Sequence, residues 1–105
     1  RTGQEGADIL KRISCQDMVI SLDRKGRLFT SRQLSSALKV WLETPGRTPC
    51  FVIGGAYGLS RGVVSRSDLT LSLGPMTLPH ELARVVILEQ LYRADAILRN
   101  LPYHH

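Results

Sequence analysis

The chain has 105 residues, of which 43% are hydrophobic, and a net charge of +5 from fourteen Lys and Arg against nine Asp and Glu. This length predicts a single domain over residues 1–105, and this hydrophobic content excludes a disordered chain. No apolar run is long enough for a membrane span, and the two cysteines, Cys15 and Cys50, lie outside any metal-ligand spacing. We therefore expect a globular domain with reduced thiols, whose positive charge suits a polyanionic partner such as RNA.

The first half of the chain alternates between helical and strand patterns. Residues 4–13 read as a helix, and residues 18–22 read as a short apolar strand closed by a polar turn through Gly26. Thr30 and Gln33 have the spacing of a capping box, so the next helix starts there and ends at Pro45-Gly46. Its apolar positions predict one face packed on a sheet: Leu34, Ala37, Leu38, Trp41 and Leu42.

The second half begins with residues 51–53, which are apolar without alternation, as expected of a central parallel strand covered on both faces. Glycines follow at 54, 55 and 58, and Ser60 is positioned to cap a short helix through Val64. Residues 69–73 alternate Leu with Thr and Ser, which predicts a strand, and a long helix runs from His80 to Leu98. This helix is apolar on nearly every side between residues 82 and 88, so we expect a subunit interface along it.

Strands that alternate with helices predict an α/β fold with a mostly parallel sheet, helices on both faces and right-handed crossovers. Three strands make a thin sheet, so we expect a further strand, a dimer partner, or both. Ligands of such folds bind beyond the carboxyl ends of the strands, where backbone groups are free. The loop after the third strand, residues 73–78, is therefore predicted to form the floor of a binding site.

Several chemistry-bearing residues have simpler structural explanations. The glycines after residue 53 match neither a Walker nor a dinucleotide motif, which leaves a tight turn or a close approach to a ligand. His80 at a helix start can hydrogen-bond backbone, and Glu89 with Arg93 has the spacing of an i, i+4 ion pair. The three histidines lack the carboxylate and cysteine neighbours of a metal site, so no metal is predicted.

Four motifs carry a family resemblance. They are Phe-Val-Ile-Gly-Gly-x-x-Gly-Leu at 51–59, Leu-Ser-Leu-x-x-Met-Thr-Leu-Pro-His at 71–80, Arg-Val-Val-x-x-Glu-Gln-Leu-Tyr-Arg-Ala at 84–94, and the terminal Pro-Tyr-His. In this order and spacing they resemble the RlmH family of SPOUT-class methyltransferases, over nearly the whole chain from about Gly6 onward. Members of that family use S-adenosylmethionine to methylate N3 of a pseudouridine in large-subunit ribosomal RNA of the assembled ribosome.

The resemblance implies a trefoil-knotted fold, a homodimer through the C-terminal helix, and a location in the bacterial cytoplasm or in a chloroplast or mitochondrion. The cofactor-binding positions that it implies are Leu22, Gly54, Gly55, Leu73, Gly74, Pro75, Met76, Thr77 and Leu78. His80, Arg84, Tyr103 and His104 match positions on the family's RNA and catalytic side, with His104 as either the base or a positioning group. Arg24, Arg61 and Arg84 would hold phosphates.

The chain departs from the family in two places. Family members have an additional N-terminal strand and helix, and His105 stands where they usually have Lys or Arg. An alternative function is a non-enzymatic RNA- or ribosome-binding α/β module that keeps the knotted dimer, and cofactor binding would separate the two. A third interpretation is a nucleotide-binding fragment of an ordinary open α/β fold.

Overall fold

A parallel three-stranded sheet forms the centre of the computed structural model, which describes residues 10–13, 17–54, 59–74 and 76–102. The strands are β1 (Asp17–Leu28), β2 (Thr48–Ile53) and β3 (Leu69–Ser72), and the helices are α2 (Ser31–Glu43), α3 (Arg61–Arg66) and α4 (His80–Leu98). The helix expected over residues 4–13 is described only in part. Residues 10–12 are helical, residue 13 is not, and residues 4–9 lie outside the described residues. The predicted α/β class with a parallel sheet is confirmed.

β1 lies in the middle of the sheet, in the order β2-β1-β3. The prediction that residues 51–53 form the central strand is therefore wrong, because β2 lies at one edge. Phe51 and Ile53 pack in one core and Cys50 and Val52 in the other. β2 is thus apolar on both faces because helices cover both faces of the sheet, not because a strand pairs with each of its edges.

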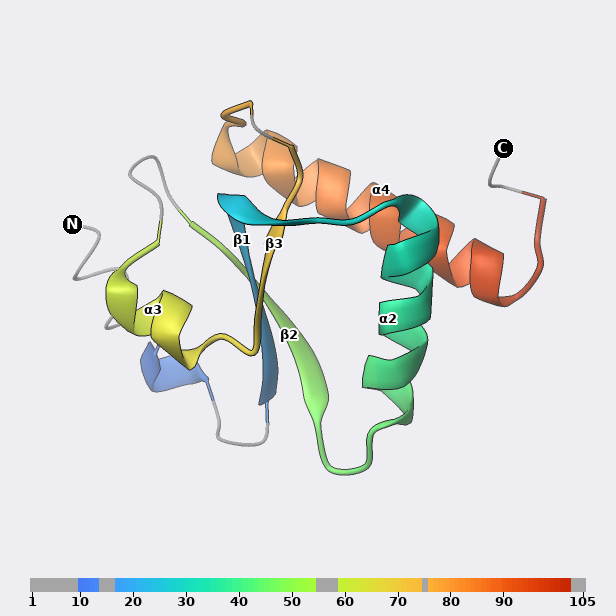
Figure 1. The fold of residues 1–105 in the computed structure, drawn as a ribbon, viewed down its shortest axis with the longest axis horizontal. Coiled ribbons are helices and arrows are strands. Elements are labelled where there is room, and N and C mark those ends of the chain that lie inside the picture. The colour runs from blue at the N-terminus through green and yellow to red at the C-terminus, as the bar shows by residue number, and fades with distance from the viewer. Residues whose placement is uncertain (1–9, 14–16, 55–58, 75, 103–105) are drawn as a thin grey trace.

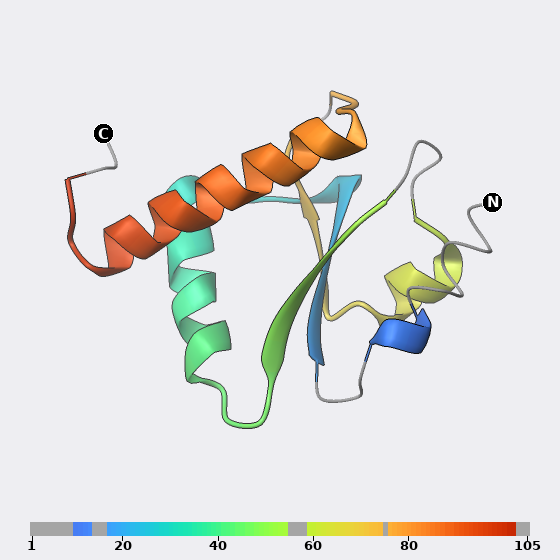
Figure 2. The same cartoon turned by 180° about the vertical axis from the view of Figure 1, so that it is seen from behind.

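Helices cover both faces of the sheet, as predicted, with α2 and α4 on one side and α3 on the other (Figures 1 and 2). The larger core joins the sheet to α2 and α4 through Ile20, Leu22, Leu34, Leu38, Trp41, Leu71, Ile87 and Ala94. On the opposite face, Val19 and Val52 pack against Val63 of α3.

The helix starts follow the capping signals. At α2, the Gln33 backbone N–H donates to Thr30 Oγ1 (3.1 Å) and the Thr30 N–H donates to Gln33 Oε1 (2.8 Å), which confirms the capping box. At α3, the Val63 N–H donates to Ser60 Oγ (3.3 Å), and the helix continues past Val64 to Arg66. One position on α2 was wrongly predicted to face the core: Leu42 is 62% exposed, because it follows Trp41 by one residue and so points about 100° away around the helix.

β1 is longer than predicted because the chain rejoins the sheet after a bulge at residues 23–26. Leu22 pairs with Leu71, and after the bulge Arg27 pairs with Leu71 again and Leu28 with Ser72. A Cβ added to Gly26 would lie 2.6 Å from the Thr70 carbonyl oxygen, so this backbone lies directly against that of β3. The polar turn predicted through Gly26 is thus a bulge packed onto the neighbouring strand.

The opposite, amino-terminal edge of the sheet is held by a cluster that we call the Asp68 clasp: Asp68, Arg47 and Arg66. The Asp68 carboxylate accepts from the Val19 N–H at 2.9 Å, from Arg47 at 3.1 Å and from Arg66 at 3.4 Å. Both arginines also donate to the Asp17 carbonyl at 3.0 Å. Burial opposes ionisation of Asp68, but the Val19 N–H and the two guanidinium groups outweigh it and hold the pKa of the carboxyl below its usual range.

The remaining expectations from the composition concern the cysteine thiols, metal ligands and membrane spans. Cys50 is a free, partly buried thiol, and burial, with the Asp17 charge, raises its pKa. Within the described ranges, no three His, Cys, Asp or Glu side chains gather as a metal site would require. In the same ranges, none of the helices has both the length and the apolar character to cross a membrane.

Candidate active site

The carboxyl ends of β2 and β3 lie at one edge of the sheet, beside the point where β1 enters its bulge. Leu22 of β1 pairs with Ile53 of β2 on one side and with Leu71 of β3 on the other. Gly54 directly follows Ile53, and the loop of residues 73–78 directly follows β3. Three segments that are far apart in the chain, and that the sequence assigned to one site, are therefore brought together.

His80 ties this edge to the start of α4. Its Nδ1 lies 3.1 Å from the Gly54 carbonyl oxygen. A carbonyl can only accept, so Nδ1 carries the proton in this contact and Nε2 is left to interact with a ligand or with solvent. The backbone hydrogen bond expected of a histidine at a helix start is present, and its acceptor is one of the predicted cofactor-binding residues.

The loop after β3 begins at a buried hydroxyl. Ser72 is 5% exposed, and its Oγ accepts from the Gly74 N–H at 3.0 Å. The same Oγ lies 3.0 Å from the Gly74 carbonyl oxygen and 3.1 Å from that of Arg24 in the bulge. Gly74 has φ +127°, and nothing lies within 4 Å of where its Cβ would be. A glycine is therefore required there, and its open side leaves room for a ligand to approach the backbone.

A cavity of about 340 Å³ lies against this loop, a volume typical of small-molecule pockets. Leu73 and Gly74 form part of its wall, together with Leu28, Phe29, Thr30, Ser31, Leu34, Leu71, Ser72, Val86, Ile87 and Gln90. Its surface combines apolar side chains with hydroxyl and backbone groups, and Ser31 Oγ donates to Gln90 Oε1 at 2.8 Å. An apolar wall with a few polar groups is what a nucleoside needs, so the residues present fit an adenosyl group.

The other predicted site residues divide into three groups. Met76 and Thr77 are exposed and Leu78 is partly buried. Arg84 is exposed one turn after His80, and among the described residues its guanidinium makes no hydrogen bond or ion pair. Four predicted residues lie outside the described residues: Gly55, Pro75, Tyr103 and His104.

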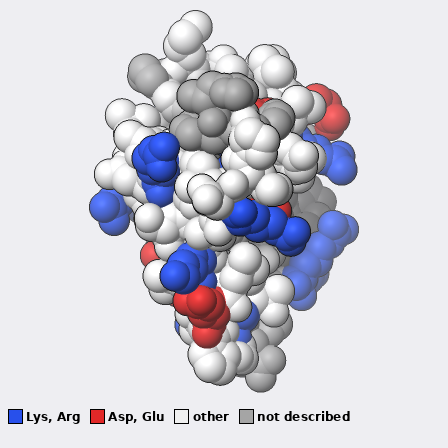
Figure 3. Space-filling view, turned by 90° about the vertical axis from the view of Figure 1, so that its right-hand side faces the viewer, with Lys and Arg blue, Asp and Glu red and all other residues white. Residues whose placement is uncertain are grey.

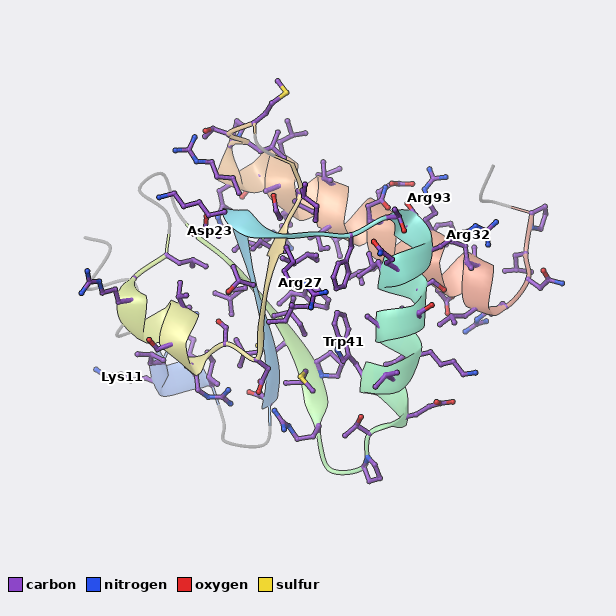
Figure 4. The ribbon with its side chains drawn as sticks, viewed as in Figure 1. Lys11, Asp23, Arg27, Arg32, Trp41 and Arg93 are labelled. Atoms are coloured by element: carbon purple, nitrogen blue, oxygen red, sulfur yellow. The ribbon has the colours of Figure 1, made fainter. Side chains whose placement is uncertain are left out.

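Arg24, Lys25 and Arg27 lie close together in the sequence, but their side chains do not form one patch. Arg24 donates to Thr77 Oγ1 at 3.1 Å, whereas the Arg27 guanidinium lies 5.5 Å from the centre of the Phe29 ring. Figure 4 shows Arg27 on the side of the strands that faces α2. On the molecular face beside α2, basic side chains are scattered among acidic and uncharged ones (Figure 3). Glu89 and Arg93 form the expected ion pair at 2.7 Å.

Two features of this edge were missed by the sequence reasoning. One is the cavity wall contributed by Leu28, Phe29 and Ile87, and the other is the contact of Arg24 with Thr77. The partners in that contact are 53 residues apart. No local spacing signals either feature. The pairing of β1 with β3 brings the β1 residues to the loop, and the packing of α4 on the sheet brings Ile87 there.

Comparison with known proteins identifies the family. A family model described as a predicted SPOUT methyltransferase matches residues 1–104. The chain belongs to the SPOUT methyltransferase family. The resemblance drawn from the four motifs is thereby confirmed, whereas the trefoil knot stays a prediction.

Three relatives of this SPOUT methyltransferase are named ribosomal RNA large subunit methyltransferase H. The relative from Nitratidesulfovibrio vulgaris (strain DP4) is 54% identical over 105 residues, which cover 100% of this chain and 67% of the relative. The relative from Maridesulfovibrio salexigens is 55% identical over 101 residues, 96% of this chain and 65% of the relative. The relative from Lawsonia intracellularis is 47% identical over 105 residues, which cover 100% of this chain and 67% of the relative. The chain thus spans about two thirds of the length of these relatives.

Proposed function

We propose that this chain is a methyltransferase that uses S-adenosylmethionine to methylate N3 of a pseudouridine in large-subunit ribosomal RNA, within the assembled ribosome. The observation that carries the proposal is the meeting of Leu22, Gly54 and the 73–78 loop at one sheet edge, in a chain of the SPOUT methyltransferase family. The name of the relatives, which specifies the RNA of the large ribosomal subunit, supports the class of substrate.

The residues that would hold the donor are the predicted set: Leu22, Gly54, Gly55, Leu73, Gly74, Pro75, Met76, Thr77 and Leu78. In this proposal the backbone N–H and C=O groups of the loop bind the polar atoms of adenine and ribose. Leu73 and the apolar side of the cavity pack against the base. The open side of Gly74 supports this arrangement, because a ligand can touch the backbone there without meeting a side chain.

Bound S-adenosylmethionine supplies a methyl group on a positively charged sulfur, which is already reactive. The chain itself contributes alignment of donor and acceptor. Holding two reactants in the reactive geometry lowers the activation barrier by up to about 7–11 kcal/mol. In this proposal His104, in its neutral form, would accept the proton from N3 of the pseudouridine, a contribution worth roughly 10²–10⁴-fold in rate. Tyr103, His80 and Arg84 would contact the RNA in this proposal, with Arg84 binding a phosphate.

A homodimer through α4 belongs to the same proposal. Leu82, Val85 and Leu88 are 47%, 60% and 56% exposed, and they follow one another at three-residue steps in the first half of the helix. Apolar side chains left in water at this spacing favour a partner surface. The proposed location is the bacterial cytoplasm, because the named relatives come from bacteria.

Calorimetric titration of the chain with S-adenosylmethionine tests the proposal. Saturable binding at one site per subunit is expected, and transfer of labelled methyl groups to ribosomes that lack the modification should follow. A chain that folds but binds no donor would overturn the proposed activity. If it still bound ribosomes, the non-enzymatic RNA-binding alternative would take its place.

A further inference from the structure

The two ends of the 73–78 loop are bonded to the same residue of the β1 bulge. At the start of the loop, the buried Ser72 hydroxyl lies 3.1 Å from the Arg24 carbonyl oxygen. Near its end, the Arg24 guanidinium donates to Thr77 Oγ1 at 3.1 Å. One residue, distant in the chain, thus reaches both ends of the segment that forms the candidate site.

The bulge that carries Arg24 is itself fixed in place. The Lys25 N–H donates to Asp23 Oδ1 at 3.0 Å, which closes a tight turn around Arg24. The Gly26 backbone then lies against that of Thr70, where even a methyl group would be only 2.6 Å from the carbonyl oxygen. Arg27 rejoins β3 directly afterwards. Because both sides of the bulge are anchored, Arg24 is attached to a rigid support.

We propose that Arg24 and Ser72 are positioning residues of the donor-binding loop, and that the bulge braces this loop for the cofactor. The inference rests on the proposed function, because it assigns a role toward the same ligand. Ser72 fixes the start of the loop through Gly74 and the bulge, and Arg24 fixes Thr77. Neither residue has to touch the donor. Their effect is to hold the backbone groups of residues 73, 74 and 76–78 in the geometry that binds it, so the loop loses less conformational freedom on binding.

The role given to Arg24 differs from the phosphate contact that the sequence suggested. A phosphate-binding arginine acts through its charge. Its neighbour Lys25 carries the same charge, and among the described residues its side chain makes no hydrogen bond or ion pair with the loop. A positioning arginine acts through its hydrogen bond to Thr77. Lys25→Ala is therefore a matched control for Arg24→Ala, because each variant removes one positive charge from the same bulge.

The test measures S-adenosylhomocysteine affinity by calorimetry in the full chain and in five variants: Arg24→Ala, Arg24→Lys, Thr77→Val, the double variant Arg24→Ala/Thr77→Val, and the charge control Lys25→Ala. Loss of one hydrogen bond should raise the Kd about three- to tenfold in Arg24→Ala and Thr77→Val. The double variant should be little weaker than either single variant, because both remove one contact. Arg24→Lys keeps a donor and should recover most of the affinity, and Lys25→Ala should stay within about twofold of the parent.

A second readout keeps the inference separate from the proposed function. Hydrogen–deuterium exchange of the chain without ligand should show faster exchange over residues 73–78 in Arg24→Ala and Ser72→Ala, with an unchanged α3. Parent-like exchange in both variants would overturn the brace, as would strictly additive losses of affinity or an equal loss in Lys25→Ala. If the parent itself did not bind S-adenosylhomocysteine, while exchange rose as expected in Arg24→Ala and Ser72→Ala, the proposed donor would be wrong. The positioning role of Arg24 and Ser72 toward the loop would still be supported.

Discussion

Gly26 shows how one residue decides the path of the chain at the candidate site. Its Cα lies so close to β3 that a Cβ would be 2.6 Å from the Thr70 oxygen and 2.9 Å from the Leu71 carbonyl carbon. Both neighbours are backbone atoms of a paired strand, so they cannot move aside as a flexible side chain would. The bulge and the strand can therefore approach only because position 26 has no side chain.

Gly26→Ala is expected to destabilise the protein by about 1–3 kcal/mol, because the added methyl group forces the bulge off β3. Thermal unfolding followed by circular dichroism would measure this as a lower Tm. The matched control is Gly62→Ala in α3, where the nearest atom to the new methyl group is the end of the Leu10 side chain at 3.2 Å. Equal losses in the two variants would contradict the close backbone contact.

His104→Ala separates binding from chemistry at the residue scale. The affinity for S-adenosylhomocysteine should change by less than about twofold, since the proposed role is toward the RNA base. The rate of methyl transfer to unmodified ribosomes should fall by roughly 10²–10⁴-fold. Transfer at the parental rate would remove His104 from the mechanism and leave alignment as the main contribution.

At the scale of elements, the sequence predicted those helices whose ends carry local signals. Thr30 with Gln33 marked the start of α2, and α4 begins at His80 and ends at Leu98 as predicted. β1 was predicted too short because the charged residues of the bulge end its apolar run. Apolar patterning shows which faces of a strand are covered but not which edges are paired, and for this reason β2 was wrongly placed at the centre.

The candidate site was predictable in part for the same reason. The 73–78 loop and Gly54 follow strands directly, and the carboxyl ends of parallel strands meet at one edge, so their convergence could be foreseen. The Arg24–Thr77 contact and the cavity wall at Ile87 depend on how distant elements pack. Such contacts follow from the three-dimensional arrangement alone.

The Asp68 clasp gives the amino edge of the sheet a dependence on pH. The pKa of Asp68 is lowered in the folded chain, so its stabilisation is present above the unfolded pKa of about 3.9 and is lost as pH falls through the folded pKa. Asp68→Asn should lower the free energy of unfolding at pH 7. The difference from the parent should shrink below about pH 4, as urea titrations at both pH values would show. A difference independent of pH would assign the loss to packing.

At the scale of the whole molecule, the first half of α4 leaves apolar side chains exposed. Val85 is 60% exposed there, and Val40 on α2 is 61% exposed. The two valines are therefore matched in residue type, helical setting and exposure. They differ in their neighbours, because Leu82 and Leu88 extend the apolar surface around Val85.

Val85→Asp is expected to convert a dimer into a monomer, because a carboxylate at the centre of an apolar interface would be desolvated without a partner. Val40→Asp should leave the dimer intact. Sedimentation velocity over a range of protein concentrations measures both. A parent that stays monomeric at high concentration, or a dimer lost equally in both variants, would count against an interface on α4.

The position of β1 has a consequence for how the protein is made. The strand that leaves the ribosome first among the three is the one that needs a partner on each side, and its contact with Asp68 spans 49 residues. During translation both edges of β1 therefore remain unpaired until β2 and β3 have been synthesised. Long-range pairing of this kind folds slowly and exposes unpaired edges to aggregation. We expect the nascent chain to acquire protease resistance only once β3 has emerged, which makes it a candidate client for chaperones that bind at the ribosome exit.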